Sequence, residues 1–239
     1  MVVFPYIGSE NIGIAYLSSV LKSKGIETKL AFEPNLFDDT KYLHFPSIPR
    51  FLNYNERFAN YIVSLKPKIA AFSLFTMNYL WALDIAKRIK DKSDIVTVFG
   101  GVHVQALPKK VLSNSQVDFI IIGEGEYALL EFVESLNEGQ VNLAIPNLGY
   151  KKENEIFVNP ARPLIEGLDT LPFPDREMFA KYEDYNVSML YLCGRGCPFK
   201  CSFCSHTVLR SQYPKGQRYV RLQSVDRCFE EMNLLKKKY

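Results

Sequence analysis

Residues 69–74, Ile69-Ala70-Ala71-Phe72-Ser73-Leu74, form an apolar run that is typical of a β-strand buried on both faces. Such strands belong to parallel sheets, because helices cover both faces of a parallel sheet. The run therefore predicts a parallel sheet with this strand in its interior.

Strands and helices alternate on both sides of this run. Apolar segments at residues 2–4, 95–99 and 119–122 are further predicted strands, and residues 27–31 are another. Ile14, Leu17 and Leu21 recur at helical spacing, and two more helices are predicted at about 80–89 and 127–136. The alternation predicts a doubly wound α/β domain of the flavodoxin or Rossmann type with a parallel sheet.

Small and polar residues follow three of the predicted strands. In sheets of this type, ligands bind beyond the carboxyl ends of the strands. Glycine at such an end lets the chain approach a bulky ligand closely, although glycine after a strand is also ordinary turn chemistry. Three such ends together favour a binding site, and its candidate residues are Ser73, Thr76, Gly100, Gly101, His103, Gly123, Glu124, Gly125 and Glu126.

The chain divides into three predicted parts. Residues 1–138 form the α/β domain, and residues 139–186 form a linker because prolines interrupt every periodic run, with one short hairpin at about 150–158. Residues 187–239 begin a second domain, with a strand at 187–192, a cysteine-rich loop at 193–206 and a final helix that Ser224 could cap.

Five cysteines all lie beyond residue 192, and four of them fall between residues 193 and 204. Such crowding suggests metal ligation more than disulfide bonding. Cys197, Cys201 and Cys204 follow a C-x3-C-x2-C spacing on one loop, so each thiolate can bind a different iron of a [4Fe–4S] cubane. Three protein ligands leave the fourth iron with an open position that a small chelating molecule can occupy.

A structural zinc site is the alternative for this loop. Cys193 would join the three other cysteines to give four thiolates, which satisfy tetrahedral zinc. Zinc sites usually pair two C-x2–4-C elements across a longer spacer, so two x3 spacings followed by x2 on one loop fit zinc poorly. We interpret Cys193 as structural and Cys228, which lies on the apolar stripe of the final helix, as a small core residue.

The cysteine loop resembles the signature of the radical S-adenosylmethionine (SAM) superfamily, C-x3-C-x-aromatic-C, with Phe203 at the aromatic position. The resemblance implies that the open iron chelates SAM and that an electron from the reduced cluster cleaves SAM to a 5′-deoxyadenosyl radical. It also implies that Phe203 lies near the adenine and that residues 187–239 begin a partial TIM barrel with its first βα unit.

The N-terminal half resembles the cobalamin-binding domain of cobalamin-dependent radical SAM proteins. The matching segments are Gly100-Gly101-Val102-His103, Asp118, Gly123-Glu124-Gly125-Glu126 and residues 168–176. The Asp-x-His-x-x-Gly loop that supplies a cobalt ligand in other corrinoid domains is absent. Any bound cobalamin should therefore lack a histidine from that motif. His103, the only histidine at a predicted strand end, is either a hydrogen-bonded turn histidine, which we favour, or a cobalt ligand.

The resemblance implies an enzyme that uses a [4Fe–4S] cluster, SAM and cobalamin for C-methylation or another radical transformation of a small-molecule substrate, with a reductant such as flavodoxin or ferredoxin. The alternatives are a corrinoid-binding module without turnover and a zinc-binding interaction module. Because 35 residues follow Cys204, we expect an incomplete barrel and exposed apolar residues on the final helix.

Composition excludes some function classes. The formal charge is only +3 and no strongly basic run occurs, so neither nucleic acid nor an anionic membrane is an expected partner. No apolar stretch is long enough for a membrane span and no signal peptide is evident, so we expect the protein in the cytoplasm.

Overall fold

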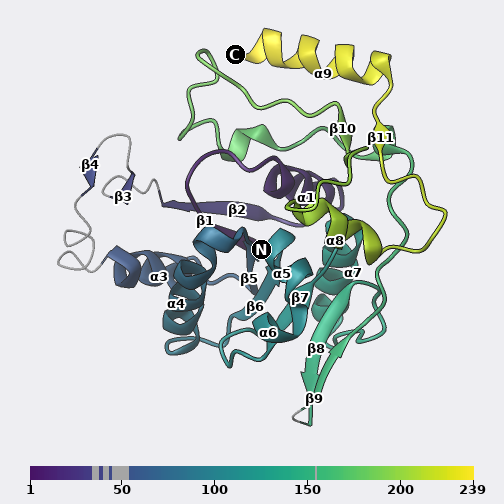
Figure 1. Cartoon of the computed structure of the whole chain (residues 1–239). Coiled ribbons are helices and arrows are strands. Elements are labelled where there is room, and N and C mark those ends of the chain that lie inside the picture. Colours follow the sequence, from purple (N-terminus) through teal and green to yellow (C-terminus); the bar gives the residue numbers. More distant parts are fainter. Residues whose placement is uncertain (34–37, 40–42, 45–53, 154) are drawn as a thin grey trace.

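The computed structural model describes residues 1–33, 38–39, 43–44, 54–153 and 155–239. A seven-stranded sheet in the order β2-β1-β5-β6-β7-β8-β9 forms its centre (Figure 1). The strands are β1 (Val2–Ile7), β2 (Thr28–Glu33), β5 (Ile69–Ser73), β6 (Val96–Gly100), β7 (Phe119–Ile121), β8 (Leu148–Lys152) and β9 (Glu155–Val158). The first five in spatial order are parallel, which confirms the predicted parallel sheet.

The order of the parallel strands is that of flavodoxin-like sheets. The chain runs outward from β1 to β2 and then returns to β5 on the other side of β1. The connections that leave β1 and β5 therefore diverge, and a crevice opens between them at the carboxyl edge of the sheet.

Helices cover both faces of the sheet, as a doubly wound fold requires. On one face α1 (Ile12–Ser23) and α7 (Glu126–Asn137) pack against Val2 and Phe4, which are fully buried. Val3 points to the opposite face, whose apolar cluster includes residues of α3 (Tyr54–Ser64), α4 (Tyr79–Lys90), α5 (Val102–Ala106) and α6 (Pro108–Leu112). The continuous apolar strands follow from burial on two faces.

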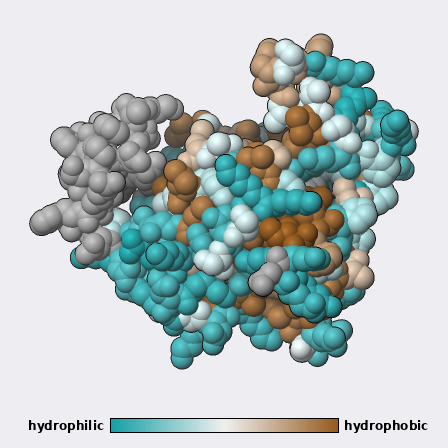
Figure 2. Space-filling view, turned by 60° about the horizontal axis from the view of Figure 1, so that its bottom comes forward, coloured by the Kyte–Doolittle hydropathy of each residue, from teal (hydrophilic) through white to brown (hydrophobic). Residues whose placement is uncertain are grey.

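The outer surface of the helices is solvated. In Figure 2 the lower left of the molecule is almost wholly hydrophilic, and apolar residues gather toward the centre and right of that face. Glu56 on α3 pairs with Arg88 on α4, and both side chains are partly exposed. No helix in the described ranges is both long and apolar enough to cross a membrane.

The predicted hairpin in the linker is confirmed, and it belongs to the sheet. β8 pairs antiparallel with β7, and β9 pairs antiparallel with β8. The sheet therefore continues past residue 138 through β9. A separate small antiparallel pair joins β3 (Asp38–Asp39) and β4 (Leu43–His44), and single 3-10 turns lie at η1 (Thr76–Asn78), η2 (Leu168–Thr170) and η3 (Arg176–Met178).

The predicted strand at 187–192 is wrong. These residues adopt no strand, and Val187 is 80% exposed. An apolar run becomes a strand only when a neighbouring strand accepts its hydrogen bonds, and here the pairing starts later, where β10 (Gly194–Arg195) runs antiparallel to β11 (Arg221–Leu222). α8 (Ser205–Ser211) lies between these two strands in the sequence.

The final helix begins where it was predicted. The Ser224 side chain accepts a hydrogen bond from the Arg227 backbone N–H and caps α9 (Val225–Lys238). α9 lies at the periphery of the molecule (Figure 1), and Val225 and Phe229 on its apolar stripe are 70% and 62% exposed. The expected exposure of this stripe is confirmed.

Buried ion pairs attach the linker and α9 to the sheet domain. The Arg176 guanidinium, in the linker, donates to Glu10 after β1 at 2.8 Å and to Glu231 on α9 at 3.3 Å. Arg176 and Glu231 are almost completely buried. Removing one member of a buried pair leaves an uncompensated charge, so these contacts fix how the three segments pack.

Gly101, between β6 and α5, lies close to the Leu74 backbone at the carboxyl edge of the sheet, and a substitution there tests this close packing. Its φ is +94°, and an added Cβ would lie 2.6 Å from the Leu74 nitrogen and 2.7 Å from its oxygen. We expect Gly101→Ala to lower the free energy of unfolding by about 3 kcal/mol, measured by urea denaturation, because backbone strain and a steric clash add.

Gly139→Ala is the matched control. Gly139 has nearly the same φ, +93°, and nothing lies within 4 Å of the position that a Cβ would take there. This substitution should therefore cost only the backbone strain, about 1 kcal/mol. Equal losses in the two variants would contradict the close approach of Leu74 to Gly101.

Candidate functional site at the carboxyl edge of the sheet

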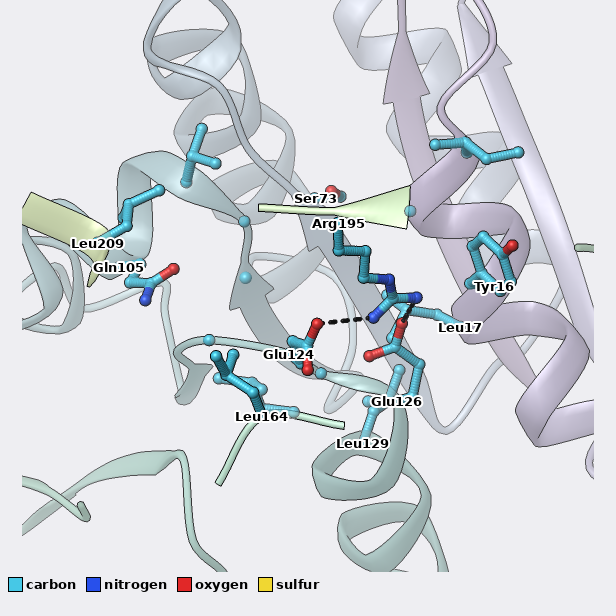
Figure 3. A pocket seen from close by; sticks show the side chains of 18 of the residues that line it. Tyr16, Leu17, Ser73, Gln105, Glu124, Glu126, Leu129, Leu164, Arg195 and Leu209 are labelled. Atoms are coloured by element: carbon cyan, nitrogen blue, oxygen red, sulfur yellow. Dashed lines mark hydrogen bonds and ion pairs between the residues drawn. The ribbon is translucent and has the colours of Figure 1, made fainter. Parts of the chain in front are cut away.

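A cavity of about 370 Å³ opens at the carboxyl edge, at the crevice between β1 and β5. The sheet domain contributes strand ends and the start of α1, the linker contributes three leucines, and the C-terminal part contributes Gly194, Arg195, Gly196 and residues of α8. Figure 3 shows side chains from these elements pointing toward one space, among them Tyr16, Leu129, Leu164 and Leu209. The walls are mainly apolar, with few polar groups, as in small-molecule sites.

Most of the predicted cofactor-binding residues meet in this cavity. Those that line it are Ser73, Gly100, Gly101, Gly123, Glu124, Gly125 and Glu126. They come from three strand ends far apart in the sequence. The interpretation of these ends as one site is therefore consistent with the geometry, although their contact with a cofactor stays a prediction.

Thr76 and His103 lie apart from the cavity wall. The Thr76 hydroxyl is 3.0 Å from His103 Nδ1, and the His103 ring packs on Tyr79 with 4.4 Å between ring centroids. Burial, and then the charge of Lys110, lower the pKa of His103, so the imidazole is neutral near pH 7. His103 thus has the hydrogen bond expected of a turn histidine, with a side-chain partner.

Asp118, another residue of the resemblance, lies at the opposite end of β7. Its carboxylate accepts hydrogen bonds from the Thr97 backbone and hydroxyl and from Lys90. These bonds join the first residues of β6 and β7. Asp118 therefore stabilises strand pairing at the amino edge.

Four charged residues form what we call the Glu124 network: Glu124, Glu126, Arg195 and Arg221. Both carboxylate oxygens of Glu124 accept from Arg221 at 2.9 Å, and Arg195 donates to Glu124 at 3.0 Å. Arg195 also donates to Glu126 at 2.6 Å, and Figure 3 shows its guanidinium between the two carboxylates. The network connects the sheet domain to the paired strands β10 and β11.

The electrostatics of the network follow from its burial. Burial alone would raise the pKa of Glu124, but hydrogen bonds from Arg221 and the charge of Arg195 outweigh it and lower the pKa below its usual range. For Arg195, burial would lower the pKa, yet Glu126 and Glu124 raise it. Glu124 and Arg195 are therefore both charged at neutral pH.

Aromatic groups complete the cavity beside the network. Burial raises the pKa of Tyr213 to about 12, so its phenol is neutral at physiological pH. The Tyr219 hydroxyl lies 2.7 Å from His206 Nδ1 in a hydrogen bond, and both residues line the cavity. The Arg195 guanidinium also lies 5.0 Å from the centre of the Tyr16 ring.

The cysteine loop follows directly after β10. Cys197 and Cys204 are partly exposed and Cys201 is exposed, all as free thiols, while Phe203 is 92% exposed. Within the described residues, no three Cys, His, Asp or Glu side chains converge as a metal site would require. The loop therefore has the right donors for a cluster, and metal binding would have to draw the three sulfurs together.

Sequence reasoning missed Arg195 and Arg221 as parts of this site. Gly194-Arg195-Gly196 lies directly before Cys197, and Arg221 belongs to no motif. Their partner Glu124 lies 71 and 97 residues away in the sequence. The one signal in the sequence was an arginine between two glycines directly before the cysteine loop.

A family model described as the B12 binding domain matches residues 7–133, which is more than half of the chain. The chain belongs to the B12-binding domain family. In the B12-binding domain, the cavity and the glycine-containing strand ends lie at the edge where this class of sheet binds ligands.

Similar proteins extend the likeness beyond the B12-binding domain. The chain is 30% identical over 233 residues to an uncharacterized methyltransferase of Pyrococcus horikoshii, a match that covers 95% of this chain and 46% of that protein. It thus spans about half the length of this curated relative. The chain is related to cobalamin-dependent radical SAM methyltransferases.

Solved structures share the fold. The radical SAM methyltransferase TsrM of Kitasatospora setae, with tryptophan and a SAM analog bound, superposes with a TM-score of 0.70 at 17% identity, over 99% of this chain and 46% of TsrM. The cobalamin-dependent SAM radical enzyme OxsB, with aqua-cobalamin and SAM bound, gives 0.69 at 19% identity, over 97% and 31%.

The Glu124 network makes stability depend on pH. We expect Glu124→Gln to lower the free energy of unfolding at pH 7 by about 2–4 kcal/mol, because the buried Arg221 guanidinium loses its carboxylate partner and the partly exposed Arg195 loses one of its two. The native pKa of Glu124 is lowered, so its contribution is present above the unfolded-state pKa of about 4.3 and is lost as pH falls through the native pKa. Denaturation curves from pH 7 to pH 3 should therefore show the two proteins converging.

Glu131→Gln is the control for this comparison. Glu131 also pairs with an arginine, Arg162, but its side chain is 42% exposed. Its loss should cost less than about 1 kcal/mol at pH 7. A Glu124→Gln difference that stayed constant down to pH 3 would contradict an ionised Glu124.

Proposed function

We propose that this chain binds cobalamin at the carboxyl edge of its sheet and a [4Fe–4S] cluster on Cys197, Cys201 and Cys204, and that it acts in SAM cleavage for C-methylation or another radical transformation. The observation that carries the proposal is the cavity itself: its walls combine the strand ends of the B12-binding domain with residues that flank the cysteine loop.

The cavity suits one part of cobalamin. Ligand pockets span roughly 300–1,000 Å³, so about 370 Å³ is at the small end and admits a group the size of a nucleotide rather than a whole corrin. Cobalamin carries a nucleotide tail on a large macrocycle. Apolar walls from Leu164, Leu168 and Leu171 favour the tail inside, and the macrocycle would then lie at the mouth.

The cysteine loop suits an iron–sulfur cluster in donor type and number. Three thiolates bind three irons of a cubane and leave one iron open. When bound, the cluster would offer SAM that open iron and supply an electron, and cobalamin would carry a methyl group. The residues of this chain would hold these groups close together, because Gly196 and His206 line the cavity and flank the cysteines.

The remaining participants follow from the same proposal. The substrate would be a small molecule, and a flavodoxin or a ferredoxin would reduce the cluster. SAM would contact Phe203, whose exposed ring is free to cover an adenine. Such an enzyme acts in the cytoplasm, where reduced thiols persist.

A corrinoid-binding module without turnover is the second candidate. One observation favours it: the family match ends at residue 133, before the cysteines. A zinc-binding module would require Cys193, which is exposed, as a fourth thiolate.

Anaerobic reconstitution with iron and sulfide tests the cluster. We expect about four irons per chain and an EPR signal of the reduced cluster that changes when SAM is added. Cys197→Ala, Cys201→Ala and Cys204→Ala should each lose most of the iron and the signal. Cys193→Ala and Cys228→Ala are the matched controls and should keep both.

Other outcomes separate the candidates. Cobalamin retained through gel filtration without any iron would support the corrinoid module. A colourless protein with about one zinc, lost in Cys193→Ala, would support the zinc module. Either result would exclude the enzyme proposed here.

A further inference from the structure

Arg195 lies between the two proposed cofactor sites and contacts residues of one while directly preceding the cysteines of the other. It lies in β10, two residues before Cys197, and its guanidinium reaches back to Glu124 and Glu126 on the B12-binding domain. The Glu126 residue is 5% exposed, whereas the Arg195 side chain is 21% exposed, so the pair is only partly accessible to solvent. An arginine that donates hydrogen bonds to two carboxylates is held in a fixed orientation by them.

Close packing around Gly196 restricts the backbone between Arg195 and Cys197. Gly196 has φ +88°, and an added Cβ would lie in severe overlap, 2.1 Å from the Tyr219 carbonyl oxygen. The chain therefore leaves β10 in close contact with the segment that leads into β11. A displacement of Arg195 would shift Cys197 with it.

The far end of the cysteine loop is attached to the same edge. Gln212, directly after α8, donates from its side-chain amide to the Gln105 backbone oxygen on α5 at 2.9 Å. The Thr207 hydroxyl donates to the Cys201 carbonyl oxygen at 3.1 Å. Both ends of the loop are thus held by residues at the edge that lines the cavity.

We propose that Arg195 is a positioning residue that sets the distance and orientation of the cysteine cluster relative to cobalamin, by anchoring the start of the cysteine loop on Glu124 and Glu126. This inference rests on the proposed function for its cofactors, but the anchoring itself is a property of the chain alone. Glu124 and Glu126 then serve the site by holding Arg195.

Hydrogen–deuterium exchange of the chain without cofactors tests the anchoring. In Arg195→Met, the hydrogen-bonded amides of β10, β11, α8 and Cys204 should exchange about tenfold faster than in the wild type, while those of β5 and β6 keep their rates. Arg195→Lys keeps the positive charge but loses the planar guanidinium that donates to two carboxylates at once. Its exchange rates should therefore lie between those of the wild type and Arg195→Met. Glu126→Gln keeps the Arg195–Glu124 bond and gives a milder variant if Arg195→Met unfolds.

Arg88→Met is the matched control. Arg88 also bridges two carboxylates, Glu56 and Asp84, but on the outer face of α3 and α4. It should leave exchange of the hydrogen-bonded amides of β10, β11, α8 and Cys204 unchanged within about twofold. Unchanged exchange in both Arg195→Met and Glu126→Gln would overturn the anchoring.

Pulsed EPR on the loaded protein tests the positioning. With cob(II)alamin and the reduced cluster both bound, the dipolar coupling between the two spins reports their separation. A narrow distribution in the wild type and a broadened or shifted one in Arg195→Met, at equal iron and cobalamin content, is the expected result. The same distribution in both proteins would overturn the inference.

The two failures are distinguishable. If the wild type binds no cluster or no cobalamin, the proposed function fails, and hydrogen exchange still decides whether Arg195 anchors the loop. If the wild type binds both and Arg195→Met behaves like it in exchange and EPR, the positioning role fails while the proposed function stands.

Discussion

The carboxylate of Glu124 is the constraint on which the arrangement of the C-terminal part depends. It accepts hydrogen bonds from Arg195 on β10, from Arg221 on β11 and from the backbone N–H of Ile165 in the linker. A buried charge is tolerated only when such donors surround it. The linker, β10 and β11 must therefore meet at the loop between β7 and α7, where their donors together satisfy the charge of Glu124.

This constraint also explains the glycines on either side of Glu124. Gly123 has φ +68°, and a Cβ added there would lie 2.9 Å from the Tyr213 hydroxyl. A Cβ added at Gly125 would lie 3.3 Å from the Leu17 side chain. The segment is thus enclosed by the C-terminal part and by α1, and its glycines allow close packing of protein on protein. Its acidic residues build the cavity wall and connect the two parts of the chain.

The sheet could be predicted because its signal is local. A strand such as β5, buried on both faces, needs an apolar run, and the run at 69–74 supplies one. The cavity could be predicted in part, because parallel strands bring Ser73, Gly100 and Gly123 to one edge. Neither Thr76 nor His103 shares that wall, since a strand-end residue can turn toward either side of the loop and its sequence position does not say which.

The arginines could not be predicted, because their role depends on partners far away in the sequence. The same holds for residues 187–192, whose apolar pattern is typical of a strand but whose hydrogen-bonding partner is missing among the described residues. In both cases the structure depends on a partner that is distant in the sequence, and the local residues do not reveal whether that partner is present. Long-range pairing of polar groups leaves no periodicity that a single sequence reveals.

The contrast between the network and the cysteine loop has a physical reason. In the network, two carboxylates pair with two guanidinium groups without any ligand, so it holds β10 and β11 in place on its own. Three thiolates drawn together without a metal would repel one another, so no such cluster is expected before iron and sulfide bind. The cysteine loop lies between β10 and β11, and both strands are held by Glu124. On the proposed function, the place of a cluster would thus be set before the cluster forms, and metal binding would have to order only the loop.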